Sequence, residues 1–137
     1  MKAKIISAAL LLSLSQISFS DPAKPNNCPT VTALQAVGIN FMHQDGDIWY
    51  GSVASVNYDT NETWSFVIGE FKATQENDAL VKANKALSSL TLTQGPLPFN
   101  MNGKDSWVCL YKDQSGHLAS AVTPTMDVAS LAKQIRF

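Results

Sequence analysis

The sequence predicts an α+β domain: a mostly antiparallel sheet of about five strands with helices packed on one face. Two segments alternate apolar and polar side chains on either side of short turns, as β-hairpins do. A third segment, residues 75–90, repeats apolar side chains at helical spacing. The predicted order is helix, three strands, helix, two strands, helix. Hairpins dominate this order, so we expect neighbouring strands to run antiparallel.

The first 20 residues have the pattern of an export signal. Lys2 and Lys4 precede an apolar stretch over residues 5–14, and small residues occupy the two positions that a signal peptidase reads before Asp21. The apolar stretch is about ten residues long, whereas a membrane-spanning helix needs roughly 20. We therefore expect a bacterial-type signal peptide over residues 1–20. The remaining residues, 21–137, form a single secreted or periplasmic domain.

The first predicted elements of this domain are a short helix and a hairpin. The helix covers residues 30–37 and ends at Gly38, a residue type that suits the position after a helix. Strands over residues 39–43 and 48–56 follow. Asp45-Gly46 lies between them, a pair favoured in type I′ turns because both central residues need positive φ.

The second half of the chain contains the strongest helix signal and a second hairpin. Apolar side chains form one stripe over residues 75–90, and Lys82 and Lys85 lie on the outer side of that helix. The remaining expectations are a strand over residues 63–71, a loop over 94–105, strands over 106–112 and 117–122, and a helix over 126–137.

The two cysteines, Cys28 and Cys109, remain after removal of the signal peptide. An even number of cysteines in an exported chain indicates a disulfide. The bridge closes a loop of about 80 residues and contributes roughly 4 kcal/mol through loop entropy. A nucleophilic or metal-binding thiol is the alternative, but neither cysteine has a CxxC partner or a neighbouring histidine.

Charge and motifs exclude several classes of function. Without Lys2 and Lys4, eight basic side chains face eleven acidic ones, a net charge of −3 with no basic stripe for nucleic acid. No second segment is apolar enough to cross a membrane. The chain has no GxSxG, HExxH, P-loop or GxGxxG motif, and its acidic residues fall mainly in turns. We therefore expect neither an enzyme nor a metal site.

Two histidines are the best candidates for ligand binding. His43 ends a predicted strand and His117 begins another, each beside a hairpin turn. If the two hairpins are neighbours, both imidazoles lie on one rim of the sheet. The alternative is that each is a solvated residue at a strand end. Tyr111 belongs to a second group of candidates, because aromatic side chains on both faces of the sheet leave one aromatic face to bind a partner.

Several segments together resemble a small, largely uncharacterised family of secreted bacterial proteins, some of whose members carry a hemin-binding label. Besides the signal peptide, they are Cys28-Pro29, residues 58–71 (YDTNETWSFVIGEF), residues 79–90 (ALVKANKALSSL), Gly95-Pro96 and residues 107–111 (WVCLY). The resemblance carries no ligand residues with it. It implies a heme ligand, and His, Tyr or Met side chains commonly bind heme iron. The chain has no CxxCH motif, which excludes covalent attachment.

The sequence thus predicts a secreted, non-enzymatic binding protein with hemin as its ligand and His43, His117 and Tyr111 as ligand-binding residues. The alternative is a protein–protein interaction module, or an envelope or host-surface module, with no small-molecule ligand.

Overall fold

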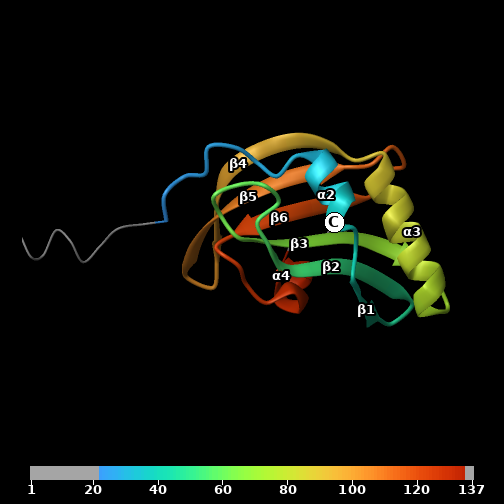
Figure 1. Cartoon of the computed structure of the whole chain (residues 1–137). Helices are drawn as coiled ribbons and strands as arrows, with labels where there is room; N and C mark the ends of the chain where they lie inside the picture. Colours follow the sequence, from blue (N-terminus) through green and yellow to red (C-terminus); the bar gives the residue numbers. More distant parts are fainter. Residues whose placement is uncertain (1–21, 135–137) are drawn as a thin grey trace, which may run out of the picture.

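A single sheet runs through the molecule in the computed structural model, which describes residues 22–134 (Figure 1). Its six antiparallel strands lie in the order β1-β2-β3-β6-β5-β4. The predicted signal peptide lies outside the described residues. The elements are α2 (Val31–Val37), β1 (Phe41–Asp45), β2 (Ile48–Val56), β3 (Trp64–Lys72), α3 (Glu76–Ser88), β4 (Thr91–Met101), β5 (Lys104–Lys112), β6 (Leu118–Thr123) and α4 (Val128–Gln134).

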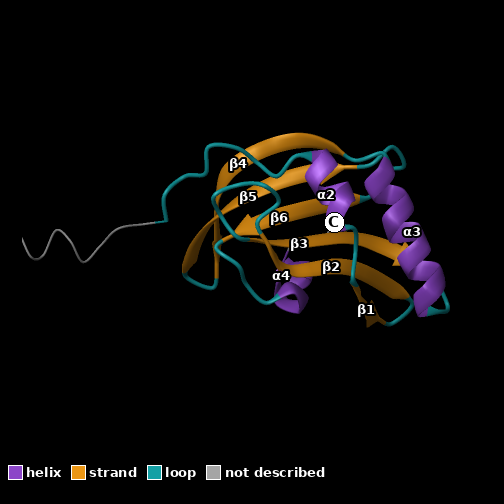
Figure 2. Cartoon of the chain, in the orientation of Figure 1, coloured by secondary structure: helices purple, strands orange, loops and turns teal. Residues whose placement is uncertain are grey.

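The predicted α+β class is confirmed, but the sheet has six strands where five were expected (Figure 2). The additional strand is β4, in the region predicted as a loop over residues 94–105. Pro96 and Pro98 suggested that loop, yet β4 is an edge strand, where proline is tolerated. Asn102 and Gly103 then form its turn into β5 with φ of 53° and 81°. This Asn-Gly pair is a strong hairpin signal in the sequence.

The first hairpin also differs in detail from its prediction. Asp45 pairs with Ile48, so Gly46 and Asp47 are the two central residues of the turn. Gly46 has a φ of 67°, whereas Asp47 does not have a positive φ. A positive φ at the first central residue alone is the pattern of a type II′ turn. The predicted type I′ turn is therefore wrong, although the hairpin itself forms.

The helices lie on both faces of the sheet, so α4 departs from the predicted arrangement. α2 and α3 cover the face on which Phe66 and Ile68 of β3 are buried. Val67 points to the opposite face, where it packs in a separate cluster with Leu131 of α4. Because successive strand side chains alternate between faces, β3, which is buried throughout residues 64–69, needs cover on both sides. α4 provides that cover for the second face.

The predicted disulfide is present and fixes the segment that precedes α2. Cys28 and Cys109 are both buried, with a Cα–Cα distance of 5.8 Å and a sequence separation of 81. The Tyr111 hydroxyl donates a hydrogen bond to the Pro29 carbonyl oxygen at 2.6 Å. Further towards the N-terminus, Trp107 Nε1 donates to the Pro22 carbonyl oxygen at 3.0 Å. β5 therefore holds residues 22–29 against the sheet. None of the helices within residues 22–134 is long and apolar enough to span a membrane.

Candidate functional site

The turn between β5 and β6 fixes a buried carboxylate. Asp113 is 7% exposed, and its Oδ1 accepts hydrogen bonds from the backbone nitrogens of Ser115 at 3.1 Å and His117 at 2.6 Å. The backbone nitrogen of Asp113 donates to the carbonyl oxygen of His117 at 3.0 Å. Aspartate commonly binds backbone groups of its own turn in this way. The local sequence therefore determines where the second carboxylate oxygen, Oδ2, points.

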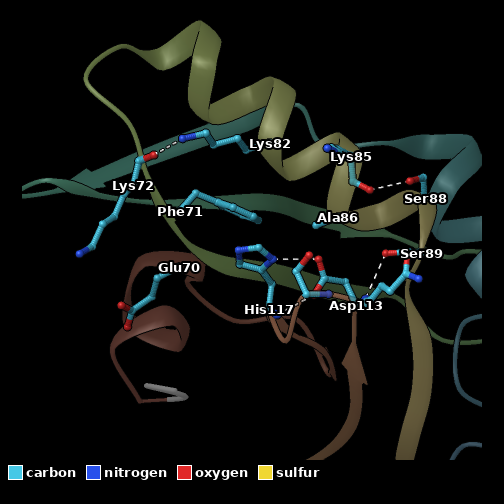
Figure 3. Close-up of a pocket in the computed structure, with 12 residues that line it drawn as sticks. Glu70, Phe71, Lys72, Lys82, Lys85, Ala86, Ser88, Ser89, Asp113 and His117 are labelled. Carbon is cyan, nitrogen blue, oxygen red and sulfur yellow. Dashed lines mark hydrogen bonds and ion pairs between the residues drawn. The ribbon is translucent and has the colours of Figure 1, made fainter.

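That second oxygen orients the imidazole of His117. The Nδ1 atom of His117 lies 2.8 Å from Asp113 Oδ2, and the ring packs against Phe71 with 4.7 Å between centroids (Figure 3). A carboxylate only accepts, so Nδ1 carries the proton in the neutral ring, and Nε2 is left with a lone pair. No residue in the described part of the chain bonds Nε2. The arrangement presents a nitrogen ligand of fixed tautomer.

A cavity of about 590 Å³ lies beside this histidine, between the 113–117 turn and α3. Its volume falls in the range of small-molecule sites, which is roughly 300–1,000 Å³. Phe71 and Ala86 contribute apolar wall, and Lys82 and Lys85 line it from α3 (Figure 3). The aliphatic stems of these lysines add apolar surface while their ammonium groups stay in water.

The chemistry of this site is that of a single metal ligand. A carboxylate on Nδ1 fixes the imidazole and makes Nε2 a stronger donor, as in many metal sites. Among residues 22–134, however, no group of three or more His, Cys, Asp or Glu side chains is placed to hold a metal ion. In the described part of the chain, His117 is thus one nitrogen donor without a cluster of further metal ligands around it.

His43 occupies a different environment. Its Nε2 atom is 3.0 Å from Ser52 Oγ, and its ring packs on Phe41 with 4.5 Å between centroids. Burial lowers the pKa of His43, and the negative charge of Asp127 opposes that shift. A cavity of about 570 Å³ adjoins Phe41, His43 and Val128. The nitrogen that would face a ligand is already engaged with Ser52.

The two histidines do not share a rim, so the predicted two-histidine arrangement is wrong. β3 separates the first hairpin from β6 in the sheet, and the hairpins are not neighbours. His43 pairs with Tyr50, whose side chain is buried in the α4 cluster. His117 packs instead on Phe71, which belongs to the α3 cluster. The two imidazoles lie on opposite faces.

Tyr111 is a core residue in the structure rather than a surface ligand. It is 1% exposed, and its ring makes an edge contact with Phe66 at 6.2 Å between centroids. Burial raises the pKa of its hydroxyl, which donates to the Pro29 carbonyl. Tyr111 therefore cannot act as the predicted ligand-binding residue. Its side chain is buried, and its hydroxyl already binds the segment that precedes α2.

Sequence reasoning missed the partners that make His117 distinctive. From the sequence, Asp113 is predicted only as one of the acidic residues in turns. An aspartate four positions before a histidine in a tight turn can, however, indicate a carboxylate–imidazole hydrogen bond. Lys82 and Lys85 were recognised only as outer residues of a helix. Their spacing of three residues already placed both on one side of α3.

One comparison with known proteins identifies a family. No curated protein and no solved structure matches the chain. A family profile described as "Domain of unknown function (DUF4949)" matches residues 27–137. The chain belongs to this family. The match includes both cysteines, both histidines and every helix and strand described above. DUF4949 membership agrees with a resemblance to an uncharacterised family and assigns no ligand.

Proposed function

We propose that this DUF4949 protein is a secreted, non-enzymatic binding protein that takes hemin through His117. One observation carries the proposal: a buried carboxylate holds Nδ1 of His117, a residue that lines a cavity of about 590 Å³, so that Nε2 keeps the lone pair in the neutral tautomer. Heme iron in proteins is commonly held by a histidine with a hydrogen bond behind it.

The residues present fit this ligand in three respects. The porphyrin ring supplies four nitrogens, so one protein ligand is sufficient where no larger cluster of metal ligands exists in the described chain. Apolar contact comes mainly from the aliphatic stems of Lys82 and Lys85, because Phe71 and Ala86 line the cavity but are only 1% and 3% exposed. Both cysteines are in the disulfide, which agrees with non-covalent binding. Hemin bound here supplies a ferric ion, and His117 orients it.

Two features support secretion. The buried Cys28–Cys109 disulfide is of the kind that persists in oxidising compartments. The charged and apolar pattern over residues 1–20 is that of an export signal. Mass spectrometry of exported protein should find an N-terminus at Asp21. Membrane-bound protein that retains Met1 would contradict this part of the proposal.

A hemin titration of the exported protein, followed at the Soret band, tests the ligand. We expect saturable binding at one site. His117→Ala should change the spectrum of the bound hemin because the axial ligand sets the electronic state of the iron. His43→Ala is the matched control and should leave that spectrum unchanged.

Two results would contradict the hemin proposal. The first is binding that ignores His117→Ala, which would indicate adsorption on an apolar surface. The second is the absence of saturable binding, which would favour a protein-interaction module. The exposed apolar side chains of β4, Leu92 and Leu97, would then be the first surface to test.

A further inference from the structure

The cavity beside His117 has a second recognition element on its α3 wall. We infer that Lys82 and Lys85 bind the carboxylates of the ligand, so that the site selects a tetrapyrrole with free carboxylates over its neutral esters. This inference rests on the proposed function, since it assigns the part of the same cavity that lies opposite the iron ligand.

The first argument is the absence of a paired counter-charge. Lys82 and Lys85 line the cavity from α3, and Lys72 lines it from β3. Among the residues that the structure describes, the one ion pair joins Asp113 and His117. No described carboxylate therefore forms an ion pair with the three ammonium groups, although Asp47 and Asp78 line a neighbouring cavity together with Lys72 and Lys82. The ammonium groups gather around one cavity although residues 21–137 carry a net charge of −3.

The second argument concerns the two acids that line the same cavity, Asp113 and Glu70, neither of which forms an ion pair with a described lysine. Asp113 already accepts hydrogen bonds from His117 and from two backbone nitrogens. Glu70 lines the cavity, and the Tyr50 hydroxyl donates to it at 3.4 Å. In Figure 3, Glu70 lies on the side away from Lys85. Asp78 lies one turn before Lys82 on α3, so the part of this wall that is open to an anion is the part at Lys85.

The third argument is geometry. Lys82 and Lys85 are three residues apart, so they lie on the same side of α3. Figure 3 shows α3 as one wall and the segment that carries His117 as the facing wall. The Nζ atom of Lys82 donates to the Lys72 carbonyl oxygen, which positions this ammonium while two of its three protons remain available. A ligand that spans the cavity meets a metal-binding nitrogen on one side and cations on the other.

The test compares hemin with hemin dimethyl ester, in the same detergent-containing buffer, on the exported protein. Exposed ion pairs are individually weak, so two of them correspond to a change in affinity of about 2- to 30-fold. We expect the ester to bind about tenfold more weakly than hemin. The variant Lys82→Gln/Lys85→Gln should weaken hemin by a similar factor and leave ester affinity unchanged. Its Soret spectrum should stay that of the unmodified protein.

Lys104→Gln/Lys133→Gln is the matched control, because it removes the same charge from residues that do not line this cavity. Equal affinity for hemin and its ester would overturn the inference while leaving the proposed function in place. So would a loss of hemin affinity no larger than that of the control variant. Iron-free protoporphyrin separates the two ideas further: it carries the carboxylates but no iron, so its binding should depend on the lysines and not on His117. Lysine-dependent binding of hemin that also ignores His117→Ala would retain the carboxylate site and reject iron ligation. If none of these tetrapyrroles binds, both fail.

Discussion

The two histidines of this protein show how a hydrogen-bond partner decides what an imidazole is available for. Each ring packs on a phenylalanine, with 4.5 Å between centroids for His43 and 4.7 Å for His117. Each also has one bonded ring nitrogen, but the nitrogens and partners differ. A serine hydroxyl engages Nε2 of His43, whereas a carboxylate holds Nδ1 of His117. Only the second arrangement leaves Nε2 without a partner among the described residues, so His43 within β1 and His117 just before β6 differ in chemistry.

The largest expected effect is on the free energy of unfolding. It tests whether the geometry of the two histidine sites depends only on their own contacts or also on the stability of the whole fold. Cys109→Ala removes the bridge between β5 and the segment before α2 and should lower the free energy of unfolding by about 2–5 kcal/mol. Urea denaturation of variant and unmodified protein measures this. Both histidine environments are made by contacts away from the bridge, so hemin affinity well below the unfolding midpoint should not change. A large loss of affinity in folded variant protein would mean that the His117 site is not local.

A smaller effect concerns the carboxylate that distinguishes the two sites. Asp113→Asn replaces an acceptor by an amide whose nitrogen can donate to Nδ1 of His117, which moves the imidazole proton to Nε2. We expect a loss of about 1–3 kcal/mol in stability, the usual cost of removing a partner from buried hydrogen bonds. The spectrum of bound hemin should resemble that of His117→Ala.

Asp127→Asn is the control for this change. The Oδ2 atom of Asp127 accepts from the backbone nitrogen and hydroxyl of Ser130 at the start of α4, a role that asparagine also fills well. Its hemin spectrum should match the unmodified protein. If Asp113→Asn also keeps that spectrum, the orienting role of the carboxylate is wrong.

The smallest effect is the pH response of His43. Burial lowers its pKa below the ordinary value of 6.5, so the unfolded chain takes up this proton first as the pH falls. The stability that neutral His43 provides is therefore complete above pH 6.5 and decreases as the pH drops from there towards the folded pKa. Urea denaturation at pH 7.5 and 5.5 should show a smaller decrease for His43→Gln than for the unmodified protein. An NMR titration that places the pKa of His43 at 6.5 or higher would contradict this.

The sequence predicted elements whose signal is local, and it missed those that depend on the assembled sheet. β2 has the predicted bounds, and α3 agrees within two residues, because the turn before β2 and the apolar stripe of α3 are local signals. β4 was missed because Pro96 and Pro98 indicate a loop unless the strand lies at an edge, and edge position is a property of the whole sheet.

The same distinction applies to the site. The sequence identified His117, but the carboxylate and the α3 wall that define its chemistry come from separate segments. The prediction that Tyr111 binds the ligand was wrong for a different reason. It lies two residues after Cys109 and therefore on the same face of β5. Because that cysteine is in a buried disulfide, the burial of Tyr111 follows from the predicted bridge and could have been inferred from it.

The edge strand β4 has a consequence for self-association. It is an 11-residue strand without a charged side chain, and an open edge of this kind is a template for pairing with another chain. Pro96 and Pro98 carry no N–H, so β4 lacks two of the donors that a strand can offer to a docking strand. The two prolines that made β4 hard to predict from the sequence thus also hinder it from pairing with a strand of a neighbouring molecule. We expect them to oppose self-association through this edge at high concentration.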